Sequence, residues 1–537
     1  MANTLKFGDG KWGAKKDSIL AYNDENANFK PLPFTTSRSS TATRINKAGL
    51  IEKVENGIPR VDYLGNTKGA MLLEPQSTNL IRYSEAFGQS YWTKSGASIQ
   101  GDPSTAGAEK VVNGDFASDT SWTKGTGWSI GSGVASYVSP GTNNNSPIFQ
   151  NVTLTIGITY RLTFNISNTT NSSIWIGNSQ GSSNYEGVSY IVRPNGSYET
   201  TFTMSSTQTT LAFYANSTSN SFDLDNVSVK EVQGFASPSS DSPLGAFKLV
   251  ENSGTGQHRM SVSISSPSAI HTISAFFKPI GTNRKAYLDL GTVTGFFDFT
   301  TKVFTSATGV GSYEEVSDGW YKLSLTSNSA VTISAIYIGL AISNETYNGN
   351  GTSGVYIFGA QLEQKSYATS YMPNYGESAG VTRLAESCGQ IPISGVIGQT
   401  EGTVYWEINV KTTVATANEN ILNIDAGSFG NTIYFSKSAT GNLVGEIYLS
   451  GVLQASFTKT NITKGVHKMA MGYANNNTAL FIDAIQIGTT DTSCTVPATN
   501  RIQLGNTAIG PSDCLSNDLK LYNTRLSNSE LATLTTI

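Results

Sequence analysis

Residues 79–99 read NLIRYSEAFGQSYWTKSGASI, and residues 113–130 read NGDFASDTSWTKGTGWSI. Each stretch places a phenylalanine five or six residues before the same Trp-Thr-Lys triplet, which begins at Trp92 or Trp122. Matching stretches of this kind indicate an internal duplication. The order in which the two copies open and close decides how the central part of the chain folds.

The two copies resemble the opening strand of carbohydrate-binding-module jelly rolls, and this resemblance implies that each copy has a matching closing strand. Two strand-like stretches are suited to this role. Residues 221–230 read SFDLDNVSVK, and residues 354–363 read GVYIFGAQLE. The order along the chain is therefore opening, opening, closing, closing, whereas tandem modules would open and close in turn. We infer that a module at 108–233 is inserted into an outer module, which is formed by 79–107 and 234–376.

The junctions between the two modules are rich in turn-forming residues. Residues 101–107 read GDPSTAG, and residues 234–243 read GFASPSSDSP. Exposed loops tolerate such insertions because the two ends of a domain often lie close together. A strand of the outer module is expected to resume at 246–251.

The composition points to strands throughout. Charged residues make up only 14% of the 537-residue chain, below the ~25% of an average globular protein. The chain instead contains 53 Gly, 24 Tyr and 23 Phe. Aromatic and β-branched residues favour strands, while Gly, Asn and Ser favour turns. We therefore predict an all-β protein with several antiparallel β-sandwich domains, one nested inside another.

Residues 385–537 form the last predicted unit. Residues 402–410 alternate as a half-buried strand. Further strands are predicted at 432–435, 444–449, 467–473, 479–482 and 501–504. Ser527 and Glu530 have the spacing of a capping box, so one short terminal helix is expected.

The part of the chain before Asn79 differs from the rest. Residues 1–35 are mixed in charge and weakly periodic, with four lysines near the start. This pattern predicts either a loosely ordered arm or a docking segment that orders on a partner. Residues 36–78 are expected to form turns and short strands.

A series of short motifs runs from Arg38 to Phe87. In order, the chain reads SRSSTATR at 37–44, GLIE at 49–52, PRVDY at 59–63, MLLEP at 71–75, TNL at 78–80 and YSEAF at 83–87. This series resembles a segment of tailed-bacteriophage fibre and spike proteins. Residues 21–26, AYNDEN, are similar to the virion-proximal start of the same proteins. The resemblance implies a structural virion protein, with 1–35 as a virion-anchoring arm and 36–78 as the fibre's N-terminal segment.

The same resemblance implies partners and a location. Other virion proteins would hold the arm, and the chain would form a homo-oligomer, most often a trimer. The protein would lie on the surface of the phage particle after synthesis in the cytoplasm of the bacterial host. Whether it is attached to the head or to the tail stays open.

Two further resemblances concern the modules. The opening stretches resemble the first strand of carbohydrate-binding-module jelly rolls. Residues 519–531, LKLYNTRLSNSEL, are similar to the closing strand and short helix of the LamG (laminin-G or concanavalin-like) sandwich. These likenesses imply two jelly rolls, at 79–107 plus 234–376 and at 108–233, followed by a concanavalin-like lectin fold at 385–537.

Several function classes are disfavoured. The net charge is −4 with no basic block, which argues against nucleic-acid binding. No apolar run is long enough to cross a bilayer, so no membrane insertion is expected, and the N-terminus lacks the apolar core of a secretory signal. The three histidines are far apart, and no nucleophile motif or pairable carboxylates stand out. We therefore predict that the protein is not an enzyme.

Sugar binding uses aromatic faces flanked by amide and hydroxyl groups. The candidates in the inserted module are Trp175, Tyr185, Tyr190 and Tyr214, with Asn178, Gln180 and Asn184 nearby. Strand aromatics more often fill a core, and we expect this of Trp122 and Trp128. In the run Ser-Ile-Trp-Ile at 173–176, alternation places Trp175 on the face opposite its two isoleucine neighbours.

The carbohydrate-module resemblance also implies a structural Ca²⁺ between the first and last strands. Asp115 and Asp225 occupy those strands and offer suitable oxygen ligands, the alternative being solvated turn carboxylates. Weaker candidates are Glu85 with Gln361, Asp425 and Asp483. No other cofactor is indicated.

Three cysteines, Cys388, Cys494 and Cys514, do not make a disulfide framework. We expect free core thiols, with a Cys494–Cys514 pair as the alternative.

These observations predict a fibre or spike protein of a tailed phage that is anchored by its N-terminus and binds host-surface glycans through β-sandwich modules. One alternative is a polysaccharide-degrading tailspike, or depolymerase, which usually contains a long β-helix; no short-period repeat of that kind is present. Another alternative is a purely architectural decoration protein of the capsid or tail. Which glycan would be bound is not indicated by the sequence.

Overall fold

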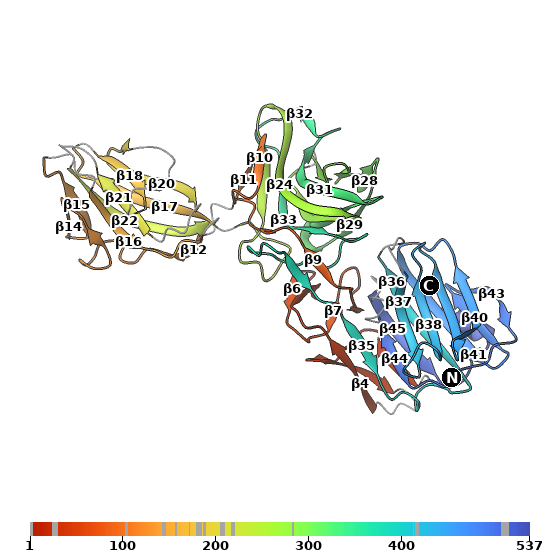
Figure 1. Cartoon of the computed structure of the whole chain (residues 1–537). Helices are drawn as coiled ribbons and strands as arrows, with labels where there is room; N and C mark the ends of the chain where they lie inside the picture. The colour runs from red at the N-terminus through yellow and green to blue at the C-terminus, as the bar shows by residue number, and fades with distance from the viewer. Residues whose placement is uncertain are drawn as a thin grey trace.

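The structure is a computed structural model of the chain (Figure 1). It describes residues 4–23, 30–101, 106–141, 146–155, 158–170, 172–178, 185, 190–204, 210–215, 221–232, 234–281, 284–411, 413, 418–505 and 515–537. Antiparallel strands form three β-sandwich bodies, which follow one another in Figure 1: a nested module, an outer module and a terminal sandwich. The predicted all-β fold with one sandwich nested inside another is confirmed.

The nested module consists of two sheets around one aromatic-rich core. The first sheet has the order β14 (Trp128–Gly131), β15 (Val134–Val138), β22 (Ser221–Val232), β17 (Thr159–Ser167) and β20 (Gly196–Thr203), with β12 (Ala106–Glu109) also paired to β22. The second has the order β13 (Thr123–Lys124), β16 (Ser146–Asn151), β21 (Thr210–Ala215), β18 (Ser173–Gly177) and β19 (Ile191–Val192). Because β12 pairs with β22, the nested sheets begin at Ala106, within the predicted junction and slightly before the predicted start of the module at residue 108.

The outer module also has two sheets, and each contains strands from both sides of the nested module. One has the order β11 (Ala97–Gln100), β23 (Phe247–Glu251), β33 (Gly354–Glu363), β25 (Thr272–Pro279), β30 (Tyr321–Ser327) and β29 (Gly309–Glu315). The other has the order β10 (Thr93–Ser95), β24 (Thr255–Ala269), β31 (Val331–Ala341), β26 (Lys285–Asp289), β27 (Thr294–Asp298) and β28 (Val303–Ser306), with β32 (Thr346–Asn348) paired to β24. The pairings β10–β24 and β11–β23 therefore close the outer fold across the insertion.

The duplicated stretches have the same local structure in both modules. The indole nitrogen Nε1 of Trp92 donates to the carbonyl of Tyr83 at 2.9 Å, and that of Trp122 donates to the carbonyl of Asn113 at 3.0 Å. The acceptor lies at the same distance before the tryptophan in both copies, and the strand that follows the tryptophan enters the edge of a sheet. Both indoles are buried, so each anchors the first turn of its module to its core.

The terminal sandwich is formed largely by the end of the chain, from Ser387 onward. Its strands are β35 (Ser387–Gln390), β36 (Glu401–Val410), β37 (Glu419–Asp425), β38 (Thr432–Lys437), β39 (Leu443–Leu449), β40 (Val452–Lys459), β41 (Gly465–Ala474), β42 (Thr478–Ile482), β43 (Ile485–Asp491), β44 (Arg501–Leu504) and β45 (Leu515–Tyr522). The helix α1 (Asn528–Leu534) follows, and the predicted capping box of Ser527 and Glu530 is present. No helix in the described ranges is both long enough and apolar enough to cross a membrane.

The first strands of the chain belong to this terminal sandwich rather than to a separate arm. They are β1 (Leu5–Gly8), β2 (Ala14–Lys15), β3 (Ser18–Asn23) and β4 (Lys30–Ser37). β1 pairs with β45, and β4 pairs with β35. The core of the sandwich includes Leu5, Phe7, Ile19, Ala21 and Phe34.

The predicted arm at 1–35 is therefore corrected for its described residues. The apolar side chains of β1 alternate with polar ones, so one face of the strand can be buried. Because lysines are frequent in this stretch, its overall composition looks polar and does not reveal the short alternation of apolar residues in β1. A pairing partner at the far end of the chain cannot be read from a local pattern.

Residues 36–80 connect the outer module with the terminal sandwich. β5 (Ala42–Ile45) and β6 (Ile51–Val54) form a hairpin, whereas β7 (Arg60–Asp62) and β8 (Ala70–Leu72) extend the sheet of the terminal sandwich next to β45. β9 (Ser77–Asn79) pairs with β34 (Val381–Arg383). Ile51 of the hairpin packs in a cluster with Phe276 and Trp320 of the outer module. This segment is thus a joint between two bodies.

Removal of the nested module tests the insertion directly. Joining Gly101 to Gly234 through a short Gly-Ser linker should leave a soluble protein whose outer module still unfolds cooperatively, because β10–β24 and β11–β23 pair without any nested strand. Calorimetry on the shortened and complete chains would measure this. Loss of the outer module's transition in the shortened chain would contradict two independently folded modules.

Candidate functional site

The outer face of the second nested sheet carries a group of aromatic side chains. On β18, Ile174 and Ile176 are fully buried in the core, so the alternation of the strand places Trp175 on the opposite face. This agrees with the predicted orientation. Trp175 is half-buried and so keeps part of its ring surface exposed.

A row of residues crosses three strands at this position. Trp175 on β18 lies directly opposite Tyr214 on β21, and Tyr214 lies opposite Pro147 on β16. The rings of Trp175 and Tyr214 meet edge to face, with centroids 4.8 Å apart and an interplanar angle of 74°. The Tyr214 hydroxyl donates to the carbonyl of Asn178 at 3.1 Å, which fixes the phenol beneath the indole. Tyr214, only 6% exposed, therefore supports Trp175.

The next row adds a third aromatic ring. Phe149 on β16 is opposite Ala212 on β21, and Ala212 is opposite Gly177 on β18. Ile148 is buried in the core, so the half-buried Phe149 lies on the same face as Trp175. Phe149 was not among the residues predicted from the sequence to bind glycan, although its alternation with Ile148 and Gln150 indicates the face on which it lies. We call Phe149, Trp175 and Tyr214 the aromatic face.

The other two predicted tyrosines are not part of the aromatic face. Tyr185 packs against the module's core, where its ring is stacked on Phe202 at 4.6 Å and 6°, and its hydroxyl donates to the carbonyl of Thr210 at 2.6 Å. Burial raises the pKa of Tyr185 to about 12. Tyr190 is half-buried and immediately precedes the edge strand β19. Gln180 and Asn184 lie outside the described residues.

The expectation that Trp122 and Trp128 belong to the core is confirmed. They are 6% and 7% exposed, and both lie in the core of the nested module. Trp128 Nε1 also donates to the carbonyl of Ser146 at 2.9 Å. Neither ring is available to a ligand.

The outer module has a corresponding sheet face, but the aromatic ring at the position equivalent to Trp175 is buried there. Tyr287 on β26 occupies the place of Trp175, between the core residues Ala286 and Leu288, but its side chain is fully buried. Opposite it, Gly339 allows the close approach of Tyr287, since a Cβ there would lie 2.4 Å from the phenol ring. The guanidinium of Arg259 covers the neighbouring Tyr337, 3.9 Å from its ring centroid. The nested module therefore presents the more accessible aromatic surface of the two.

The carboxylates suggested for calcium lie in different surroundings. Asp115 is exposed, and one of its oxygens accepts from the amide of Ala117 at 3.4 Å. Asp225 is half-buried and accepts from the backbone and side-chain amides of Asn226 at 2.6 and 3.0 Å. Among the described residues, no group of three or more His, Cys, Asp or Glu side chains is arranged to hold a metal ion. A calcium ion shared by Asp115 and Asp225 stays a prediction.

The weaker calcium candidates have protein partners. Glu85 accepts from Ser242, Tyr371 and Tyr375 at 2.6, 3.1 and 3.2 Å. The side-chain oxygen of Gln361 accepts from the amide of Met372 at 2.7 Å. Asp425 forms a bidentate ion pair with Arg501 at 2.8 and 2.9 Å, and Asp483 pairs with His467 at 2.7 Å.

The described cysteines are buried free thiols. Cys388 and Cys494 both lie in the core of the terminal sandwich, and burial raises the pKa of each thiol. Cys514, the other member of the alternative pair with Cys494, lies outside the described residues.

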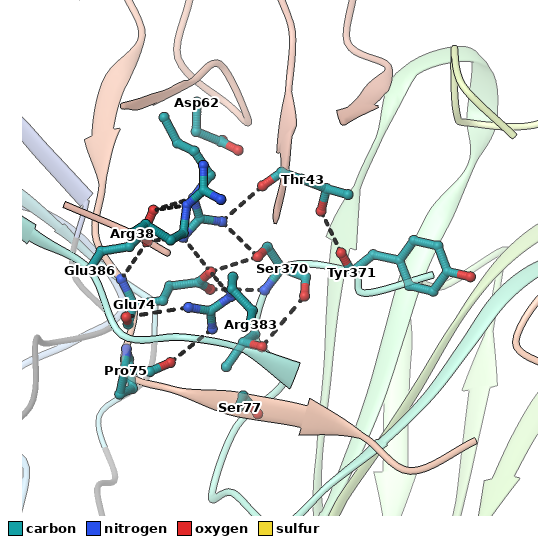
Figure 2. A network of polar contacts seen from close by, with 12 residues as sticks. Arg38, Thr43, Asp62, Glu74, Pro75, Ser77, Ser370, Tyr371, Arg383 and Glu386 are labelled. Carbon is teal, nitrogen blue, oxygen red and sulfur yellow. Dashed lines mark hydrogen bonds and ion pairs between the residues drawn. The ribbon is translucent and has the colours of Figure 1, made fainter. Parts of the chain in front are cut away.

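The phage-like motifs of residues 38–80 converge on a buried charge cluster (Figure 2). We define this cluster as Arg38, Arg60, Glu74, Arg383 and Glu386, whose side chains are all at most 4% exposed. Three of them come from the motif series, Arg383 comes from β34, and Glu386 comes from the short segment between β34 and β35. The cluster therefore ties together segments that are far apart in the sequence.

Arg60 is the centre of the charge cluster. Its guanidinium binds both oxygens of Glu386, donates to Glu74 at 2.9 Å, and donates to the carbonyl of Thr43 at 2.8 Å. It also donates at 2.7 Å to the hydroxyl of Ser370, a residue of the segment after the last strand of the outer module. Charge-assisted hydrogen bonds of this kind are the strong ones in proteins.

The surrounding charges set the ionisation of the cluster. Burial alone would raise the pKa of Glu74, but Arg383 and Arg60 beside it hold that pKa well below its ordinary value. Arg383 also donates to the carbonyls of Glu74 and Pro75 at 3.3 and 2.9 Å. The motif series thus forms an internal joint, a role that the sequence resemblance did not indicate.

No family model and no curated protein sequence matches the chain. Among solved structures, the CBM40 of Ruminococcus gnavus IT-sialidase bound to α2,3-sialyllactose is 16% identical, with 27% of this chain and 91% of that chain covered and a TM-score of 0.23. The CBM22-1–CBM22-2 tandem of Paenibacillus barcinonensis Xyn10C is 10% identical over 50% of this chain and 100% of that chain, with a TM-score of 0.23. Domains LG4-5 of the mouse laminin α1 chain are 10% identical over 52% of this chain and 88% of that chain, with a TM-score of 0.20. At these scores the neighbours are distant, and the sheets of this chain themselves establish its β-sandwich fold.

Proposed function

We propose that this chain is a non-enzymatic fibre or spike protein of a tailed bacteriophage, located on the virion, that binds host-surface glycans through its nested module. The observation that carries the glycan-binding part is the aromatic face. Trp175 and Phe149 keep exposed ring surface, and Tyr214 holds the indole in place from below. Flat apolar rings that are rigidly supported suit the C–H faces of sugar rings, because they lose little freedom on binding.

The virion part of the proposal is supported by the motif series between Arg38 and Phe87. β1 and β45 pair, so both ends of the described chain lie in the terminal sandwich (Figure 1). We propose that this sandwich, rather than a free arm, is the end held by other virion proteins. The nested module lies farthest from it in Figure 1, where contact with a cell surface is least obstructed. Assembly as a trimer would multiply the strength of individually weak sites.

Replacing Trp175 by Ala is expected to weaken glycan binding by roughly five- to thirtyfold, because loss of a stacking ring removes about 1–2 kcal/mol. The complete chain would first be screened on an array of bacterial-surface oligosaccharides, and its tightest ligand would then be titrated by calorimetry. The matched control is Phe429→Ala, which removes a 40% exposed aromatic ring from the terminal sandwich and should leave the affinity unchanged.

Three outcomes would contradict the proposal. An equal loss of glycan affinity in Trp175→Ala and Phe429→Ala would show that the glycan does not bind at the aromatic face. Absence of any glycan ligand would favour the architectural alternative. Release of reducing sugar from host polysaccharide would favour the depolymerase.

A further inference from the structure

The neighbouring strands β29 and β30 of the outer module have a polar outer face. Leu323 and Leu325 of β30 are buried in the core of the outer module, so Lys322, Ser324 and Thr326 lie on the opposite face. The register places Glu314 opposite Lys322 and Ser312 opposite Ser324. The two serine hydroxyls are 2.7 Å apart. This face therefore carries one acid, one base and a row of hydroxyl groups.

The terminal sandwich adds two lysines in front of this face. Val410, the last residue of β36, pairs with Gly465, the first residue of β41. This pairing places Lys411 and Lys464 side by side, because each is the next residue beyond the paired strand ends. The ammonium nitrogen of Lys411 lies 3.8 Å from a carboxylate oxygen of Glu314.

These groups line one cavity between the two bodies, with a volume of about 50 Å³. We call it the lysine cleft. Its wall includes Lys322, Lys411, Lys464, Glu314, Ser312 and Ser324. A water centre needs roughly 10–15 Å³, so the cleft has room for a few waters or one small charged group, but not for a whole sugar ring.

The charges of the lysine cleft do not balance. The described residues that line it include three lysines and one carboxylate, Glu314, so its wall carries more basic than acidic side chains. Burial and the nearby carboxylate of Glu74 act to raise the pKa of Glu314, but Lys411, Lys322 and Lys464 outweigh them and lower it, so this carboxylate stays ionised. Lys322 also donates to the carbonyl of Thr369 at 2.6 Å, which fixes one of the three ammonium groups. The remaining positive charge favours an anion.

We propose that the lysine cleft binds the carboxylate of an acidic sugar residue. In this arrangement the lysines neutralise the carboxylate, and the hydroxyls of Ser312 and Ser324 line the same cleft. This site lies in a different part of the chain from the aromatic face and takes a ligand of different charge. It exists only where the outer module and the terminal sandwich meet, so it also depends on their joint.

The test is a calorimetric titration of the complete chain with trigalacturonic acid, and with neutral galactotriose and inorganic sulfate as comparison probes. We expect the acidic trimer to bind and its affinity to fall with added salt. The double variant Lys411→Gln/Lys464→Gln should lose about tenfold in affinity. Glu314→Gln should instead bind the trimer more tightly, because it removes the carboxylate that lies among the lysines.

The matched control replaces two lysines of the outer module outside the cleft, Lys278→Gln/Lys302→Gln, which are paired with Asp318 and Glu315. It should leave the affinity unchanged. Thermal unfolding of each variant checks that the fold is intact. Equal affinity of the wild type and the Lys411/Lys464 variant would overturn the proposal. Equal binding of galactotriose, or binding of sulfate without binding of the acidic trimer, would also overturn it.

Discussion

The variant Arg60→Met is expected to lower the free energy of unfolding by about 3–5 kcal/mol, because removal of one partner leaves buried charges without compensation. Arg60 is completely buried and binds both Glu74 and Glu386. Methionine fills a similar volume but donates no hydrogen bond, so two buried carboxylates lose a cation. Denaturant unfolding followed by tryptophan fluorescence measures the change.

A matched variant separates this effect from the general loss of a surface arginine. Arg44→Met removes the partner of Glu52, in a pair whose side chains are 25% and 35% exposed. Pairs of this type contribute less than about 1 kcal/mol. Comparable losses in both variants would show that the charge cluster has no special role in the joint.

The wild-type protein is expected to lose stability as the pH rises from 5 to 7, and the variant Glu85→Gln is expected to abolish this loss. Burial raises the pKa of Glu85 from 4.5 to about 7, against the hydrogen bonds from Ser242, Tyr371 and Tyr375. Between these two values the folded protein keeps the proton that the unfolded chain has released, so stability falls as the pH rises. A shift of this size corresponds to about 3 kcal/mol lost by the wild type above pH 7.

The measurement is the denaturation midpoint of the outer module at pH 5, 6, 7 and 8. Glu85→Gln should flatten this profile and be the more stable protein at pH 8. Glu315→Gln, which replaces an exposed glutamate of the same module, should keep the wild-type slope. An unchanged slope in Glu85→Gln would place the origin of any pH dependence elsewhere.

Local patterns in the sequence were sufficient for much of the fold. The repeated Trp-Thr-Lys stretches and their two closing strands predicted the nesting, and the alternation around Trp175 predicted the face on which it lies. The capping box predicted α1. These features depend on neighbours within one strand or one turn, so they can be read without knowing which strands pair.

Other features depend on pairings across the chain. Nothing near Leu5 indicates that β1 joins β45, and nothing near Arg60 names Glu386 as its partner. The lysine cleft likewise brings Lys322 of the outer module next to Lys411 of the terminal sandwich, and these two bodies meet only when the chain is folded. The acidic and basic residues looked like ordinary surface charges in the sequence, because burial is a property of the tertiary structure.

The pairing of β1 with β45 also sets an order in which the protein can be completed on the ribosome. The nested module is contiguous, so its core can form once Val232 has emerged, whereas the outer module must wait for β33. Leu5 meets its partner Leu521 only when almost the whole chain has been made, roughly half a minute to two minutes later at ordinary rates of synthesis. Until then, the apolar face of β1 lacks its native cover. β1 is therefore made long before the strand that covers it, and during that interval its apolar face can contribute to aggregation of the nascent chain.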